Sequence, residues 1–151
     1  MAEISNDQAL RTAIDKLDPQ RQRILGAHFV QSVLHLSQDA RINRAIEVAN
    51  NRDASPAELE DAFRAAKGYA VKTYTACGKD TDWLAQADHF VAAAAAAALQ
   101  PASEGGKEVS RAWKAAIQAR MAKNCEMMEQ EGVEPDTEAQ KQYDVAGAFL
   151  G

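Results

Sequence analysis

The sequence predicts an all-α protein, a single-domain bundle of about six to seven helices around a buried, alanine-rich central helix. Signals that start and stop helices recur along the whole chain, and no segment shows the alternation of apolar and polar residues typical of a β-strand. The middle of the chain holds seven consecutive alanines, from Ala92 to Ala98. Alanine has the highest helix propensity, and its small side chain lets neighbouring helices approach closely. We therefore expect this segment to be the central contact of the bundle.

Two helices are expected before residue 37. Ser5 and Gln8 have the spacing of a capping box, in which each side chain accepts a hydrogen bond from the other residue's backbone N–H. The first helix then ends at Asp18. Asp18 and Pro19 start a second helix, because Asp is a good N-cap and Pro is favoured in the first turn. The apolar stripe of this helix continues to Leu36, so we expect it to pack broadly.

Two further helices are predicted on either side of residue 50. Asp39 is the expected N-cap of a third helix, whose apolar residues recur at helical spacing. Ser55, Pro56 and Glu58 form the strongest start signal in the chain. They combine an N-cap, a first-turn proline and the carboxylate of a capping box. The fourth helix is expected to end at Cys77, next to Gly78.

The rest of the chain predicts three more helices. Asp80 or Thr81 is the expected cap of the fifth, which carries the alanine run and ends at Pro101. The sixth is expected over about Lys107–Gln130, and a short seventh after Pro135. The sixth helix has a stripe of large apolar residues that we interpret as its core-facing side: Val109, Trp113, Ile117, Met121, Cys125 and Met128.

The composition fits one soluble globular domain over residues 1–151. Lys and Arg number 17 against 22 Asp and Glu, so the formal net charge is −5, and no dense basic run offsets it locally. An acidic chain of this kind repels phosphate backbones and anionic lipids. The charge therefore disfavours nucleic acid and membrane surfaces as partners, and is compatible with a basic protein partner.

The chain carries no signal for export, membrane insertion or a disulfide framework. Its first residues, Met1–Asp7, are polar and acidic, and its longest apolar run, Phe90–Leu99, is about half the length that spans a bilayer. Cys77 and Cys125 lie far apart on apolar stripes, so we expect small core residues in a reducing compartment. The sequence therefore favours a cytoplasmic protein without a cofactor.

His28 and His35 are the candidate metal or ligand residues, because they lie seven residues apart on one edge of the second predicted helix. They can share a metal ion only if a third group joins them from another helix. A di-iron bundle needs Glu three residues before each His, and those positions hold Leu25 and Ser32. We interpret the pair as flank packing, and a metal or small-ligand site is the alternative.

Two other polar groups carry a functional and a structural interpretation. Asp88 and His89 resemble the orienting pair of a general base, but neighbours on a helix point about 100° apart, so we expect surface residues. The carboxylates from Glu126 to Glu138 form an acidic stretch. It either faces a basic partner or is a solvated helix end and loop, and we interpret it as the latter.

The segment Asp39–Ala49 resembles the D-x-R-x-x-x-A-I-E-x-A motif of a family of immunity proteins from bacterial polymorphic toxin systems. An apolar helix end precedes the segment and alanine-rich helices follow it, so the similarity extends over about Leu25–Leu99. The resemblance implies a small, all-helical, cytoplasmic protein that neutralises a cognate toxin by binding it. It singles out Asp39, Arg41 and Glu47 as signature positions with a structural or an interface role.

These observations together predict a non-enzymatic, protein-binding helical domain, for which the resemblance implies the role of an immunity protein that neutralises a bacterial toxin. A bundle that binds a small ligand or a metal, and an oligomeric scaffold protein, are the alternatives. No catalytic, cofactor-binding or metal-ligating residue is assigned. The sequence leaves open which surface binds the partner and whether the chain forms a homo-oligomer.

Overall fold

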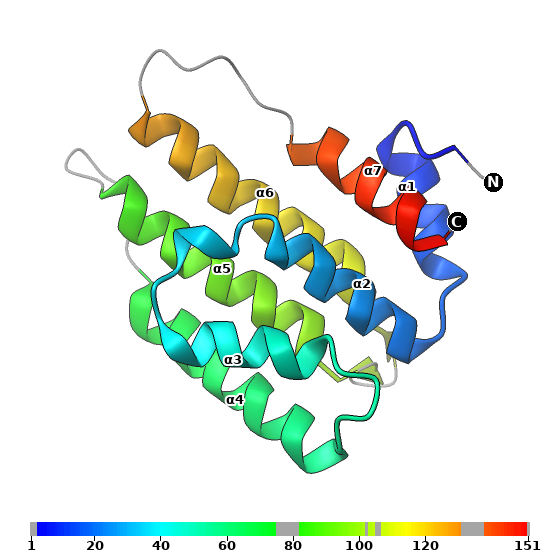
Figure 1. The fold of residues 1–151 in the computed structure, drawn as a ribbon, viewed down its shortest axis with the longest axis horizontal. Coiled ribbons are helices and arrows are strands. Elements are labelled where there is room, and N and C mark those ends of the chain that lie inside the picture. The colour runs from blue at the N-terminus through cyan, green and yellow to red at the C-terminus, as the bar shows by residue number, and fades with distance from the viewer. Residues whose placement is uncertain (1–2, 75–81, 102, 105–106, 131–137, 151) are drawn as a thin grey trace.

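The fold is a bundle of α-helices with one small hairpin (Figure 1). The computed structural model describes residues 3–74, 82–101, 103–104, 107–130 and 138–150. Within these ranges the elements are α1 (Asp7–Asp15), α2 (Pro19–Gln31), the 3₁₀ turn η1 (Leu34–Leu36), α3 (Ala40–Ala49), α4 (Pro56–Thr73), α5 (Trp83–Leu99), β1 (Ser103–Glu104), β2 (Lys107–Glu108), α6 (Arg111–Glu129) and α7 (Glu138–Leu150). The all-α fold class is confirmed. None of the described helices is both long and apolar enough to cross a bilayer.

The helices form two layers and an edge. α4, α5 and α6 lie side by side with α5 in the middle, and α2 and α3 cover one face of this layer (Figure 1). α5 makes its most extensive contacts with α6 and then with α4. α1 and α7 contact each other and lie at one edge of the bundle, against α6. α5 is therefore the central helix.

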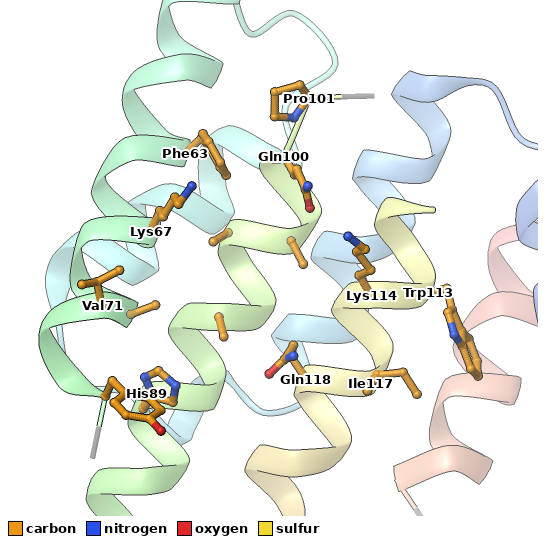
Figure 2. Close-up of a pocket in the computed structure, with 15 residues that line it drawn as sticks. Phe63, Lys67, Val71, His89, Gln100, Pro101, Trp113, Lys114, Ile117 and Gln118 are labelled. Atoms are coloured by element: carbon orange, nitrogen blue, oxygen red, sulfur yellow. The ribbon is translucent and has the colours of Figure 1, made fainter. Parts of the chain in front are cut away.

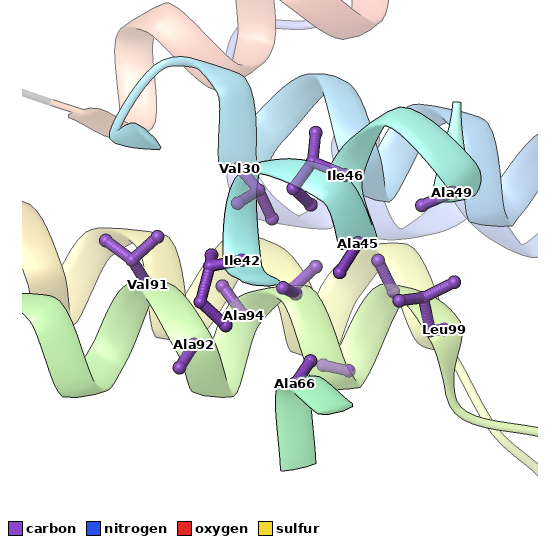
Figure 3. Close-up of a cluster of buried hydrophobic side chains, with 14 of the residues drawn as sticks. Val30, Ile42, Ala45, Ile46, Ala49, Ala66, Val91, Ala92, Ala94 and Leu99 are labelled. Atoms are coloured by element: carbon purple, nitrogen blue, oxygen red, sulfur yellow. The ribbon is translucent and has the colours of Figure 1, made fainter. Parts of the chain in front are cut away.

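The interior around α5 is built mainly from alanine. Five alanines of α5 have no exposed surface: Ala87, Ala92, Ala94, Ala95 and Ala98. Figure 3 shows Ile42 and Ile46 of α3 lying over this face of α5, with Val30 of α2 beside them. Since the side chains on α5 are single methyl groups, its neighbours can approach at short interaxial distances and still exclude water.

α2 passes close to the central layer at Gly26. A Cβ atom at this position would lie 3.1 Å from Cβ of Ala98 and 3.5 Å from Cβ of Ala115. Three helices therefore meet at a point where one contributes no side chain and the other two contribute a methyl group each. The prediction of a buried, alanine-rich central helix is confirmed.

A second hydrophobic cluster attaches the edge helices. Phe29 of α2 is fully buried there, in a cluster with Leu10 and Ile14 of α1 and Ala146 of α7. Phe29 is the largest side chain that the described part of the chain buries completely. The bundle thus combines an alanine-lined centre with a periphery filled by large aliphatic and aromatic groups.

Three of the expected helix starts are confirmed. Asp18 and Asp39 cap α2 and α3, and each side chain accepts a hydrogen bond of 2.8 Å from a first-turn backbone N–H. Ser55 and Glu58 form the complete capping box of α4, with bonds of 3.1 and 3.0 Å. Local side-chain chemistry is sufficient to set these boundaries.

Two other caps differ from the prediction. Asn6 rather than Ser5 caps α1, because its Oδ1 accepts a hydrogen bond of 2.8 Å from a backbone N–H. Asp82 caps α5 in the same way, at 3.1 Å. The predicted caps of this helix, Asp80 and Thr81, lie outside the described residues.

Several helices are shorter than predicted, and α1 already ends at Asp15 rather than at Asp18. α2 ends at Gln31, where the hydroxyl of Ser32 lies 2.8 Å from a backbone carbonyl oxygen of the last turn and competes with the helical hydrogen bonds. The segment up to Leu36 then forms the separate turn η1. α4 ends at Thr73, and Cys77 with Gly78 lies outside the described residues. α6 begins at Arg111 because residues 107–108 pair with residues 103–104.

α6 turns a different stripe towards the core from the one predicted. Its fully buried residues include five alanines: Ala112, Ala115, Ala116, Ala119 and Ala122. Trp113 and Ile117 are only partly buried, and Met121 and Met128 are 40% and 55% exposed. Cys125 is buried as expected. The close packing of α6 on α5 has room for methyl groups but not for indole or thioether side chains, so the larger residues lie to one side.

Two buried arginines hold helix ends, which the sequence analysis did not identify. Arg23 of α2 donates hydrogen bonds to the carbonyl oxygens of Ala49 and Asn51, at 2.9 and 2.7 Å, where α3 ends. Arg111 donates to the carbonyl oxygen of Gln100, at 3.3 Å, where α5 ends. Both side chains place positive charge at helix C-termini, where the macrodipole favours it. Burial lowers the pKa of both guanidinium groups.

Candidate functional site

A groove of about 930 Å³ runs along α5 on the face that α2 and α3 leave open (Figure 2). α4 forms one wall and α6 the other, and we call it the α5 groove. α5 contributes to its floor three small side chains at helical spacing, Ala93, Ala96 and Ala97. The other lining residues are Phe63, Lys67, Ala70, Val71 and Tyr74 of α4 and its end, His89, Gln100 and Pro101, and Trp113, Lys114, Ile117 and Gln118 of α6.

The groove is open to solvent rather than enclosed. Two of its large apolar side chains, Val71 and Tyr74, are 71% and 70% exposed. Trp113 and Ile117 on the opposite wall are partly buried. Trp113 and Ile117 lie beside the alanine interface between α5 and α6, not within it. Exposed apolar side chains gathered along one open groove make it the candidate interaction surface in the described part of the chain.

The charges on the groove have one sign. Lys67 and Lys114 stand on opposite walls and are both exposed (Figure 2), and none of the described lining residues is Asp or Glu. The ammonium group of Lys67 lies 5.6 Å from the ring centroid of Phe63. Neither lysine has an acidic partner among the described residues. In a chain of net charge −5, the α5 groove is thus a locally cationic, mainly apolar surface.

His89 lies at one end of the groove and is held by its neighbours. Its Nδ1 is 3.2 Å from Oγ1 of Thr73, and its ring makes an edge contact with Tyr74 at 5.8 Å between centroids. Asp88 points elsewhere, because its carboxylate accepts a hydrogen bond from the hydroxyl of Tyr69. The two residues do not face each other, as expected, but the prediction that they are surface residues is wrong, since both are partly buried and hydrogen-bonded. Burial, assisted by the carboxylate of Asp88, raises the pKa of Tyr69 to about 12.

Asp39 and Arg41 form a local brace at the start of α3. The carboxylate of Asp39 accepts hydrogen bonds from Nε and Nη2 of Arg41, at 3.0 and 2.9 Å. The guanidinium of Arg41 lies 5.0 Å from the ring centroid of Tyr69 on α4. The hydrogen bonds from Arg41 hold the pKa of Asp39 below its usual value. These two signature residues therefore join α3 to α4.

Glu47 is placed differently from the other two signature positions. Its side chain is exposed on the outer face of α3, and within the described ranges no ion pair joins it to Arg44 or to another cation. None of the three signature residues lines the α5 groove.

His28 and His35 do not form a shared site. Nε2 of His28 lies 3.1 Å from Oδ1 of Asn50, and Nε2 of His35 lies 2.9 Å from Oε2 of Glu126. The two residues are in different elements, α2 and η1, and contact different helices. In the part of the chain that the structure describes, no group of three or more His, Cys, Asp or Glu side chains is placed to hold a metal ion.

The acidic stretch is not a continuous solvated face. Glu126 is buried, with Oε1 2.6 Å from Nζ of Lys123 and Oε2 bound to His35. Glu138 is also buried, and its carboxylate contacts the hydroxyl of Ser32. The interpretation as a solvated helix end is therefore wrong for both ends of the stretch. Between them Glu129 is exposed, and the carboxylates at positions 131, 134 and 136 lie outside the described residues.

Replacing Glu126 by glutamine is expected to weaken the pH dependence of stability in acid. Burial alone raises the pKa of Glu126, but the hydrogen bonds from Lys123 and His35 outweigh it and hold the pKa below its usual value of 4.5. A depressed carboxylate pKa contributes stability above the unfolded-state value, and this is lost as the pH falls through the folded-state value. Denaturant unfolding of Glu126→Gln should therefore change less than that of the wild type between about pH 5 and pH 3.

Glu60→Gln is the matched control for this prediction. Glu60 pairs with Arg64 at 2.8 Å, but both side chains are exposed, so the change should leave the curve within about 0.5 kcal/mol of the wild type. The pKa of Asp7 is lowered by its hydrogen bond from Arg120. Part of the pH dependence of the free energy of unfolding should therefore remain in both variants. If the free energy of unfolding of Glu126→Gln changed with pH in parallel with that of the wild type, the hydrogen bonds of Glu126 would not be the source of the acid dependence.

The groove residues were missed because the sequence analysis assigned large apolar residues to the core. One signal was available: Val71 and Tyr74 fall beside, not on, the stripe of small residues Ala62, Ala66 and Ala70 that α4 buries. Two apolar stripes on one helix indicate two contact surfaces.

Comparison of the chain with protein-family models, with curated proteins and with solved structures found no match.

Proposed function

We propose that this chain is a non-enzymatic protein-binding domain that acts as an immunity-type inhibitor of a bacterial toxin, with the α5 groove as its binding surface. The observation that carries the proposal is the groove itself: an open, apolar trough with a lysine on each wall and no acidic residue among its described lining. Protein interfaces have an apolar centre with a polar rim, and the groove has this arrangement.

The exposure of the groove favours a protein over a small ligand. Pockets for small molecules bury most of the ligand surface, whereas Val71 and Tyr74 leave most of their own surface in solvent. His28 and His35, the basis of the ligand alternative, are each engaged with a residue of a different helix. A scaffold role would use the same groove for a second copy of the chain, and homo-oligomer formation is a measurable alternative.

The immunity role rests on the resemblance around Asp39–Ala49. The hydrogen bonds and ring contact of Arg41 support a structural role for the first two signature residues, because they fix α3 on the helix that forms one groove wall. Glu47, the third signature residue, is exposed on α3 and lies outside the α5 groove, so the proposal gives it no part in binding the partner. In this proposal the protein acts in the bacterial cytoplasm on a toxin that reaches that compartment, and binds neither nucleic acid nor membrane.

Co-expression with a toxin tests the proposal. We expect a toxin-like reading frame beside the gene, and expect the chain to restore growth when both are expressed in the same cell. Ala96→Leu should abolish rescue, since the larger side chain fills the groove floor without entering the core. Glu47→Lys is the matched control on a different surface and should still protect.

Each outcome of this experiment has a defined meaning. Growth arrest in the presence of the wild-type chain would contradict the immunity role. Rescue that survives Ala96→Leu but is lost with Glu47→Lys would move the interface from the α5 groove to the outer face of α3. The amount of folded protein should be measured for each variant, so that loss of rescue is not confused with loss of the fold.

A further inference from the structure

We infer that the α5 groove receives one amphipathic α-helix of the partner protein, about three turns long, with carboxylates beside its apolar stripe. This inference rests on the proposed protein-binding function, which it deepens by naming the chemistry of the bound segment. It follows from the length of the groove, the chemistry of its floor and the sign of its charges.

The length of the groove fits a short helix. On α4 the lining runs from Phe63 to Tyr74, and on α5 it runs from His89 to Gln100. At 1.5 Å per residue, each of these stretches is about 16 Å long, which corresponds to about three helical turns. A segment of this length can present anchor residues at i, i+3, i+4 and i+7 to a continuous apolar surface.

The floor of the groove allows close approach of a helix. Ala93, Ala96 and Ala97 project only methyl groups between the two walls, so a helix can lie near α5 much as α2 does where it passes Gly26. α4 and α6 would then flank the incoming helix on either side of α5. The complex would be locally a four-helix arrangement, with the fourth helix supplied by the partner.

An extended segment fits this groove less well than a helix. The groove is lined by α4, α5 and α6 and the residues at their ends, whose backbone hydrogen bonds are made within the helices, so it offers no row of free N–H and C=O groups. A strand bound there would leave its own backbone groups without protein partners. A helix satisfies these groups internally and needs only side-chain contacts.

The charges select acidic flanks. Lys67 and Lys114 rise from opposite walls, so carboxylates on both edges of a bound helix can each reach one ammonium group (Figure 2). No described lining residue is acidic, so nothing in the groove repels such a helix locally. Because the whole chain has a net charge of −5, selectivity for acidic flanks must come from these two lysines and not from the mean field.

Selection from a phage library of helical peptides, with all surface positions randomised, tests the inference on the intact protein. Wild-type protein is the target, and Ala96→Leu protein is used to remove sequences that bind elsewhere. We expect enriched sequences with an apolar stripe at i, i+3, i+4 and i+7 and Asp or Glu beside it. The synthetic form of the best peptide should bind about tenfold more tightly than the same peptide with Gln in place of its acidic flanks.

A charge reversal makes the test specific. In Lys67→Glu/Lys114→Glu protein the order should invert, so that a Lys-flanked version of the peptide binds better than the acidic one. Both lysines are exposed, and an unchanged circular dichroism spectrum and midpoint of unfolding verify the fold of the variant. A preference for acidic flanks that persists in the reversed protein would overturn the inference. So would enriched sequences without helical periodicity, or the absence of enrichment over the Ala96→Leu protein.

Two further results separate this inference from the proposed function. If Ala96→Leu abolishes protection from the toxin but no helical peptide binds, the proposed protein-binding function is retained and the inference that the bound segment is a helix is rejected. If acidic helical peptides bind but the chain protects against no toxin, the inference that the groove binds an acidic helix is retained and the immunity role is rejected. Sedimentation of the protein alone should give a monomer. A dimer that dissociates on Ala96→Leu would show that the occupant is a second copy of the chain, which contradicts the inference.

Discussion

Replacing Ala98 by leucine is expected to lower the free energy of unfolding by about 3 kcal/mol. Ala98 has no exposed surface, and its Cβ already lies within 3.1 Å of the place where a Cβ on Gly26 would be. The three additional carbon atoms of leucine therefore have no space between α2 and α5. Either α2 must move away from the central layer, or the new side chain must take an unfavourable rotamer.

Ala96→Leu is the matched control, because it makes the same substitution two residues earlier on the same helix. Ala96 lies on the floor of the α5 groove, where a leucine side chain can extend into solvent-filled space. We expect its stability to stay within about 0.5 kcal/mol of the wild type in urea unfolding. Equal losses for the two variants would contradict the assignment of one face of α5 to the core and the other to the groove.

Phe29→Ala is expected to cost about 4 kcal/mol, the largest loss among the single changes considered. Phe29 is fully buried between α2 and the edge helices α1 and α7, in the only described cluster that holds a large aromatic side chain without exposure. Its removal leaves a cavity that the surrounding helices can fill only by shifting. The loss should appear as a lower midpoint of unfolding with an unchanged slope in urea.

Tyr74→Ala is the comparison for this change, since it also removes an aromatic ring. Tyr74 is 70% exposed at the edge of the α5 groove, so we expect its removal to change stability by no more than about 0.5 kcal/mol. A loss as large as that of Phe29→Ala would show that the groove wall is part of the folding core and not a surface reserved for a partner.

The existence of the helices and the starts of α2, α3 and α4 were predictable because their causes are local. Asp18, Asp39 and the Ser55–Glu58 box act on backbone groups within three residues, so the sequence alone contains the interaction. The central position of α5 was also predictable, since a helix that is apolar on all sides is normally buried. These features need no knowledge of which helices meet.

The stripe of α6 was predicted wrongly for a physical reason. Large apolar residues are usually the buried ones, and Trp113, Ile117 and Met121 recur at helical spacing. The alanines of α6 recur at the same helical spacing, but on a different side of the helix. Which stripe is buried depends on the partner helix, and α5 presents methyl groups that pack most closely on other methyl groups. Of the displaced large residues, Trp113 and Ile117 line the α5 groove, whereas Met121 does not.

Long-range polar contacts were equally hidden from sequence. His35 was considered as a partner of His28, but it binds Glu126, which follows it by 91 positions. Arg23 likewise reaches the end of α3, 26 positions along the chain. Neither contact produces a periodic pattern in the sequence, so no rule based on residue spacing can predict it. The same limit applies to the α5 groove, whose two lysines come from helices that are separated in sequence by α5 itself.

The most direct test of this account is solvent paramagnetic relaxation of alanine methyl groups, measured by NMR on protein labelled at alanine. The account predicts that a soluble paramagnetic agent broadens the methyl signals of Ala93 and Ala96, which face the α5 groove, and spares those of Ala94, Ala95 and Ala98, which are fully buried. Broadening of both sets alike would mean that α5 is not enclosed. Protection of Ala93 and Ala96 would mean that the groove is closed, and the binding proposal would then lose its surface.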